Sequence, residues 1–166
     1  MRVLKYALAA SLIAASSSAV AQQLSIATGG TGGTYYPYGG GIAELINNQL
    51  EGYEAVAEVT GASVENMGLV WRGDSDVALA LADTVYQGAT GTGDFEGRKL
   101  ENIRAIASIY PNAVQIVTMA DSGIDSLDDL EGKVVSVGAP GSGTELNARA
   151  ILEANGLSYD DFDARR

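Results

Sequence analysis

The strongest restriction on the fold comes from two glycine-rich loops, each of which follows an apolar strand-like run and precedes a helical one. The first loop follows Leu24–Thr28 and the second follows Val134–Val137. Strand-like runs at residues 54–59 and 77–81 lie between them, and they alternate with segments in which apolar residues recur with helical spacing. Strands that alternate with helices form βαβ units, so we expect an α/β fold with mostly parallel sheets.

The middle and the end of the chain continue this pattern. Ile103–Ile109 and Val114–Met119 are predicted to be two strands, and residues 126–130 a short capped helix. A last helix is expected to run from the second loop to Asn155, with Gly156 in the left-handed position that often ends a helix. No strand-like run remains to complete a second sheet, so we expect this sequence to be part of a longer chain. The alternative is that the last strand joins the first sheet.

Composition argues against several classes of active site. The 166 residues include no cysteine and no histidine, which removes disulfides, thiol nucleophiles, Ser-His-Asp triads and zinc sites with imidazole or thiolate ligands. We therefore expect no enzymatic activity, no metal and no cofactor. The 21 acidic residues outnumber the ten basic ones, and such a charge repels nucleic acid and anionic lipid.

The first 21 residues have the order of a secretory signal peptide. Arg2 and Lys5 precede an almost wholly apolar stretch at residues 6–15, and alanine, valine and alanine at 19–21 supply a cleavage site. The apolar stretch is shorter than the ~20 residues that span a bilayer, which argues against a membrane anchor. We predict cleavage after Ala21 and a periplasmic protein that is not inserted in the membrane. Because cleavage removes two basic residues, eight would face 21 acidic ones, a net charge of −13.

Glycine-rich loops between a strand and a helix are common ligand sites of open α/β sheets. A helix N-terminus carries unpaired N–H groups and about half a positive charge, so it receives carboxylate or phosphate. Nucleotide motifs are not satisfied, because Tyr35 replaces the third glycine of the dinucleotide fingerprint and Thr144 replaces the P-loop lysine. A small carboxylate or an amino acid is the expected ligand. The loop residues predicted to contact it are Thr31, Gly32, Gly33, Thr34, Tyr35, Tyr36, Ser142, Gly143 and Thr144.

Structural roles remain open for some of the same residues. Ser142 and Glu145 fit a capping box, in which each side chain bonds the other's backbone N–H. The first loop is alternatively a flexible surface loop. Ser63 and Asn66 begin another helix after a strand, either as ligand contacts or as a cap and a solvent-facing residue.

Four blocks of sequence carry a family resemblance. They are Ile26–Pro37, Gly61–Asn66, Asp129–Lys133 and Val137–Ala148. The first and last blocks are long and specific, and the middle two are short. In this order, across nearly the whole chain after residue 21, they resemble the TAXI family (TRAP-associated extracytoplasmic immunogenic proteins), the substrate-binding subunits of TRAP transporters.

The resemblance implies a two-lobed fold of the periplasmic-binding-protein type (type II), which closes by a hinge around a small organic acid or acidic amino acid. Residues 22–110 would form lobe one, and residues 111–166 would begin a lobe two that is incomplete in this chain. The protein would deliver its ligand to the integral-membrane subunits of the transporter. After the third strand the family pattern has polar residues before an aspartate. This chain has Leu81-Ala82 before Asp83, which is included among the predicted ligand contacts.

Two other classes of function remain open from the sequence. An exported α/β hydrolase or transferase would need a nucleophile with an activating base, and neither histidine nor a G-x-S-x-G elbow occurs. A surface interaction protein without a small ligand would have no cleft between its lobes.

Overall fold

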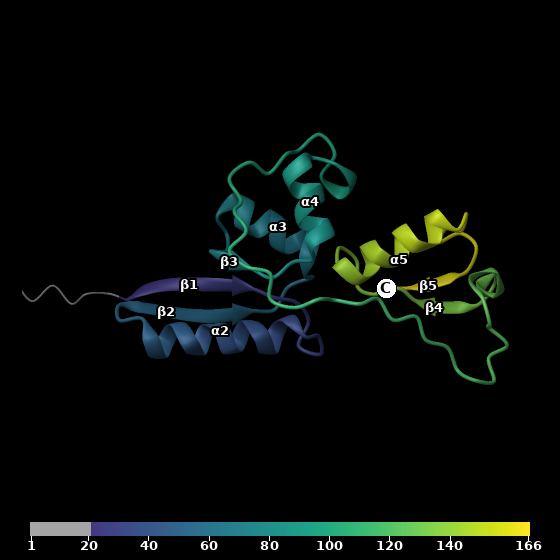
Figure 1. Ribbon diagram of the computed structural model, residues 1–166, viewed down its shortest axis with the longest axis horizontal. Coiled ribbons are helices and arrows are strands. Elements are labelled where there is room, and N and C mark those ends of the chain that lie inside the picture. Colours follow the sequence, from purple (N-terminus) through teal and green to yellow (C-terminus); the bar gives the residue numbers. More distant parts are fainter. Residues whose placement is uncertain (1–20) are drawn as a thin grey trace, which may run out of the picture.

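The computed structural model describes residues 21–166, which fold into two α/β units joined by a segment without regular secondary structure (Figure 1). The predicted signal peptide, residues 1–21, lies outside the described residues except for Ala21. We call residues 21–103 the first unit, residues 104–120 the crossover segment and residues 121–166 the second unit. In the described part of the chain, no helix combines the length and the apolar character needed to span a bilayer.

The first unit is a parallel sheet with helices on both faces. Its elements are β1 (Gln22–Ala27), α2 (Tyr35–Gln49), β2 (Tyr53–Glu58), α3 (Ser63–Arg72), β3 (Val77–Ala78), α4 (Ala82–Thr90) and the 3-10 helix η1 (Gly93–Phe95). The strand order is β2-β1-β3, and both pairs are parallel. Figure 1 shows α2 on one side of the sheet, and α3 with α4 on the other. The predicted α/β fold with parallel sheets is confirmed.

The carboxyl end of β1 is the most buried part of this unit. Ile26 and Thr28 are fully buried, as expected for a central strand that is covered on both faces. Gly39 of α2 lies so close to the strand that a β-carbon there would overlap the Thr28 methyl group. On the other face, Met67 and Phe95 belong to the cluster that packs α3 against the chain after α4. The loop that follows β1 therefore starts from a rigid base.

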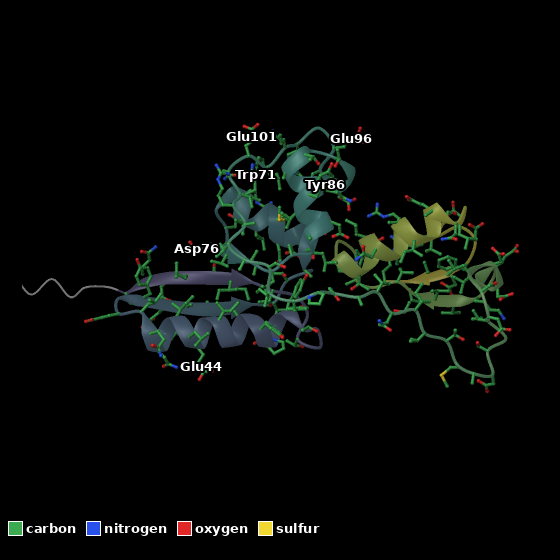
Figure 2. The ribbon with its side chains drawn as sticks, in the orientation of Figure 1. Glu44, Trp71, Asp76, Tyr86, Glu96 and Glu101 are labelled. Atoms are coloured by element: carbon green, nitrogen blue, oxygen red, sulfur yellow. The ribbon has the colours of Figure 1, made fainter. Side chains whose placement is uncertain are left out.

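Charged side chains of the first unit lie on its outside. Figure 2 shows Glu44 pointing away from α2, and Glu96 and Glu101 pointing outward beyond α4. The guanidinium group of Arg98 lies 5.8 Å from the ring centre of Trp71, within the range of a cation–π contact. Glu44, Glu96 and Glu101 are all exposed to solvent.

The second unit is smaller. Its elements are the 3-10 helix η2 (Leu127–Leu130), β4 (Val134–Ser136), α5 (Gly143–Ala154) and β5 (Asp163–Arg165). The Asp129 carboxylate accepts from the Ser126 N–H at 2.8 Å, which is the capping predicted for η2. Strands β4 and β5 are parallel neighbours, and Leu152 of α5 belongs to one buried cluster with Val137, just after β4, and Phe162, just before β5.

The expectation that no partner strand follows the last helix is wrong, because β5 pairs with β4. Val137 N–H donates to Arg165 O at 2.9 Å, and Asp163 N–H donates to Lys133 O at 2.8 Å. β5 has only three residues, too few to show an alternation of apolar and polar side chains. Backbone hydrogen bonds hold it to β4. Neither β4 nor β5 joins the first sheet.

The two strands predicted at residues 103–109 and 114–119 are absent. A strand needs a neighbour for its backbone N–H and C=O groups, and none of the described residues pairs with this segment. Ile106, Val117 and Met119 are 84%, 86% and 75% exposed, although their alternation is typical of a half-buried strand. The strand prediction for these residues is therefore wrong, because an apolar pattern carries no information on whether a partner strand is present.

Candidate functional site

A cavity of about 470 Å³ lies between the two units, next to the loops that follow β1 and β4. Its wall consists of these two glycine-rich loops, the first residues of α3 and α5, and part of the crossover segment. The lining residues are Gly29, Gly30, Gly32, Gly33, Thr34, Tyr35, Ala62, Ser63, Leu81, Tyr110, Asn112, Gly138, Ala139, Ser142, Gly143 and Thr144. All of these side chains are uncharged. Polar contacts with a ligand must therefore come from hydroxyl, amide and backbone N–H groups.

The first loop ends at an N-terminus of α2 that has little capping. Gly33 N–H donates to Gly30 O at 2.9 Å, which closes a turn inside the loop. Thr34 precedes the helix, but its side chain makes no capping hydrogen bond to any described residue. The first turn also contains no acidic residue. Since the first N–H groups of a helix have no intrahelical acceptor, this helix end is available to an acceptor in the cavity.

The start of α3 is strained and buried. Ala62 has a φ of 72°, in the left-handed region that favours glycine. A non-glycine residue held there costs roughly 1–3 kcal/mol, and such strain is concentrated at functional sites. Ser63 is the first residue of the helix rather than the cap, which corrects the capping alternative. Its buried Oγ accepts from Leu81 N–H at 3.1 Å, so it connects α3 with the start of α4.

Tyr35 brings a phenol to the same part of the cavity. Burial raises the pKa of Tyr35 above its ordinary value, and the nearby Tyr110 and Asp83 raise it further. A hydrogen bond with Ser63 acts in the opposite direction. The net rise keeps the Tyr35 hydroxyl protonated at neutral pH, so it remains a hydrogen-bond donor.

Asn66 lies behind the cavity wall and is not among its lining residues. The side chain is fully buried, which contradicts the solvent-facing alternative. Its Nδ2 donates to Thr28 O at 2.6 Å and to Leu79 O at 2.7 Å, and its Oδ1 accepts from Thr60 Oγ1 at 2.6 Å. Asn66 thus links the residue after β1 to the residue after β3 by hydrogen bonds. A segment that lines the cavity follows each of these two residues.

The second loop ends at a capped helix. Ser142 Oγ accepts from Glu145 N–H at 3.1 Å, but the Glu145 carboxylate points to Arg149, 3.4 Å away, so the predicted capping box is half formed. A β-carbon on Gly143 would overlap the Leu81 side chain and approach Ser63 Oγ to 2.9 Å. Only glycine therefore lets α5 come this close to the first unit.

The two units also bond to each other directly beside the cavity. Val64 N–H donates to Gly141 O at 3.1 Å, so the second loop already occupies one N–H group of α3. Arg149 of α5 lies 3.1 Å from the Asp94 carboxylate of η1. Burial lowers the pKa of Arg149, but the carboxylates of Asp94 and Glu145 outweigh this effect, and the net pKa is raised. These two contacts join the first and second units in the observed arrangement.

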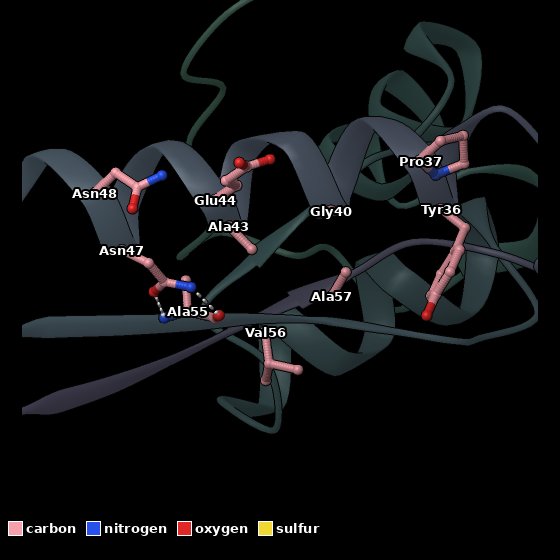
Figure 3. A pocket seen from close by; sticks show the side chains of 10 residues that line it. All are labelled: Tyr36, Pro37, Gly40, Ala43, Glu44, Asn47, Asn48, Ala55, Val56 and Ala57. Atoms are coloured by element: carbon pink, nitrogen blue, oxygen red, sulfur yellow. Dashed lines mark hydrogen bonds between the residues drawn. The ribbon is translucent and has the colours of Figure 1, made fainter.

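Three further predicted residues do not line the cavity. Tyr36 faces a separate, open groove of about 550 Å³ between α2 and β2 (Figure 3). In that groove the Asn47 amide bonds both the N–H and the carbonyl oxygen of Ala55, at 2.6 and 3.1 Å. Asp83 accepts from Thr84 N–H at 2.6 Å at the start of α4. Thr31 is exposed in the first loop.

The structure brings together eight of the predicted contacts in one cavity wall. They are Gly32, Gly33, Thr34, Tyr35, Ser63, Ser142, Gly143 and Thr144. Sequence reasoning missed Tyr110 and Asn112, which enter the wall from the crossover segment. The signal that could have identified them is the interruption of two strand-like runs by Tyr110-Pro111-Asn112, since a turn between strands is a frequent place for binding residues.

Comparison with protein families agrees with this geometry. The sequence model of the NMT1-like family matches residues 26–166, which include all of the second unit, the first unit from Ile26 onward and every residue of the cavity wall. This family is periplasmic-binding-protein-like, and its members bind solutes. The chain belongs to the NMT1-like family and is in this general sense a solute-binding protein.

Proposed function

We propose that this protein captures a small organic acid or acidic amino acid in the periplasm and delivers it to the membrane subunits of a TRAP transporter. The proposal goes beyond family membership and follows the TAXI resemblance of the loops. The observation that carries it is the cavity between the units, whose wall includes the N-terminal residues of both α2 and α5. Each helix N-terminus carries about half a positive charge, which favours a carboxylate over a neutral or cationic ligand.

The mechanism is a shift between open and closed arrangements. A ligand that contacts α2 from the first unit and α5 from the second gains more interactions when the units are closed. The chain passes from the first unit to the second through the crossover segment, residues 104–120 (Figure 1). Binding would therefore favour the closed form, and release would require the two loops to separate.

The acidic character of the chain is compatible with an acidic ligand. The formal net charge is −11, but the lining side chains are uncharged. At physiological ionic strength the Debye length is about 8 Å, so surface carboxylates farther away are screened. The nearest helix ends therefore determine the local potential.

Calorimetric titration and thermal unfolding test this proposal with a panel of probes. Succinate and L-glutamate represent the acids, while glucose and choline represent neutral and cationic ligands. An acid present at 100 times its Kd should stabilise the protein by about 2.7 kcal/mol. Stabilisation by glucose or choline alone contradicts the proposed ligand class.

Export and transport need separate measurements. Protein recovered from a periplasmic fraction should begin at Gln22, the residue after the predicted cleavage site. Uptake of the bound acid into vesicles should require both this protein and TRAP membrane subunits. Uptake that is independent of the protein contradicts its role as the delivering subunit.

A further inference from the structure

Tyr110 is the aromatic residue of the crossover segment that reaches the cavity. Its ring lies against Tyr38 of α2, with ring centres 4.9 Å apart and planes inclined by 38°. This contact fixes the ring against the first unit, while the residue belongs to the segment that joins both units. Tyr110 is therefore placed where ligand binding and closure can act on the same side chain.

The hydroxyl of Tyr110 is buried without a partner. In residues 21–166, Tyr110 Oη is the one buried side-chain nitrogen or oxygen that has no hydrogen-bond partner. Buried polar groups are almost always hydrogen-bonded, and leaving one unpaired is costly. Tyr110 belongs to the wall of the cavity, so a ligand that reaches its hydroxyl would supply the missing partner.

The hydroxyl is in the form that donates. Burial raises the pKa of Tyr110 above its ordinary value, and the neighbouring Tyr38 raises it further. The group is protonated at neutral pH, as an ordinary tyrosine is, so it can donate to an acceptor. The lining side chains are uncharged, and the polar ones carry hydroxyl or amide groups, so an oxygen acceptor on the ligand is a matching partner for Tyr110 Oη.

We propose that Tyr110 Oη donates a hydrogen bond to a second oxygen acceptor of the bound acid, while the helix end at Thr34 and Tyr35 receives its carboxylate. This inference rests on the proposed function and makes it more specific. The ligand class becomes small acids with two separated acceptor groups, such as dicarboxylates. Monocarboxylates with an apolar tail would leave the hydroxyl unpaired.

The test compares Tyr110→Phe with the unchanged protein, using succinate and its monocarboxylate counterpart butyrate as probes. Phenylalanine keeps the contact with Tyr38 and removes only the orphan oxygen. Calorimetric titration should show succinate binding weakened by about 10- to 150-fold, the range for a hydrogen bond to a charged group. Butyrate binding should change by less than about twofold, because butyrate presents no acceptor to the hydroxyl.

Thermal unfolding without ligand supplies an independent readout. Removing an unpaired buried hydroxyl should raise the melting temperature of Tyr110→Phe, so stability and succinate affinity change in opposite directions. Tyr38→Phe is the matched control, since Tyr38 is 43% exposed and is not part of the cavity wall. This control should leave both quantities unchanged.

Three results overturn the inference. Unchanged succinate affinity in Tyr110→Phe shows that the hydroxyl does not contact the ligand. Equal losses for succinate and butyrate show that it contacts a carboxylate shared by both. Failure of every acid to bind the unchanged protein is a different result, which removes the proposed function and this inference with it.

Discussion

The N-termini of α2 and α5 both open into the cavity, but they are satisfied to different degrees. At α2, Thr34 provides no side-chain cap and the first turn has no acidic residue. At α5, Ser142 caps the Glu145 N–H and a glutamate occupies the first turn. A helix end that already has an acceptor and a carboxylate nearby attracts an external anion less strongly.

Because of this difference, we expect the two units to have different roles in ligand binding. The end of α2 is the stronger anion receptor, and it is held by a buried base at the carboxyl end of β1. The end of α5 acts mainly by approaching closely, since Gly143 packs against Leu81 and Ser63 of the first unit. We therefore expect the first unit to determine ligand charge, and the second unit to determine whether the cavity closes.

The largest expected effect is on the free energy of unfolding, and it comes from Asn66, which supports the loop before α2. Asn66→Ala removes the partner of the Thr28 and Leu79 carbonyl oxygens and of the Thr60 hydroxyl. Each unpaired buried group costs about 1–3 kcal/mol, so the free energy of unfolding should fall by about 3 kcal/mol or more. Urea unfolding measures this change.

Asn112→Ala is the control for that prediction. Asn112 is exposed and lines the cavity, so its removal should change the free energy of unfolding by less than about 0.5 kcal/mol. Similar losses for the two variants would mean that Asn66 does not support the loops in the way its hydrogen bonds indicate.

The next effect concerns the close approach of α5. Gly143→Ala places a methyl group against Leu81, and overpacking of this kind costs about 1–3 kcal/mol. Because the contact is between the units, we expect the cost to weaken acid binding by about 5- to 150-fold. Gly41→Ala in α2 is the matched control, with open space around its β-carbon, and it should be slightly stabilising. Equal affinities for both variants would show that the units need not approach this closely.

Sequence reasoning succeeded where local pattern and topology act together. The strand–loop–helix order predicted both glycine-rich loops, and residues of the two loops, such as Gly33 and Ser142, lie in one cavity wall. It could not predict that Ser63 lines the cavity while Asn66 lies behind its wall. Both residues are in the first turn of α3, and only packing decides which side chain turns toward β1. Three-residue strands such as β5 leave no periodic signal, and the strand-like residues 103–119 have no partner among the described residues.

Adding one negative charge to each helix end in turn tests the comparison of the two ends directly. Thr34→Asp adds a negative charge to the N-terminus of α2, so the helix should gain about 0.3–1 kcal/mol while succinate affinity falls about tenfold. Thr144→Asp adds the same charge to α5, where Glu145 is already present, and the affinity loss should be less than about threefold. A larger loss from Thr144→Asp, measured by calorimetry, would reverse the assignment of the anion to α2.

The smallest expected effect is the ion pair that joins the units. Arg149 and Asp94 are partly exposed, with side chains 39% and 28% accessible, so the pair contributes about 0–1 kcal/mol. Asp94→Asn should weaken acid binding by about two- to fivefold at low ionic strength, because the closed form loses a contact that the open form lacks. At 1 M salt the Debye length is about 3 Å, and the difference from the unchanged protein should shrink toward zero.

Asp74→Asn is the matched control for the interunit pair. Asp74 lies 2.7 Å from Arg72, but both residues belong to the first unit, so this ion pair does not change when the units separate. Its removal should leave acid affinity unchanged at every salt concentration. A salt-independent loss in Asp94→Asn, or the same loss in Asp74→Asn, would mean that the Arg149 contact does not contribute to closure. In that case the approach of α5 is supported by Gly143 and by the Val64–Gly141 hydrogen bond.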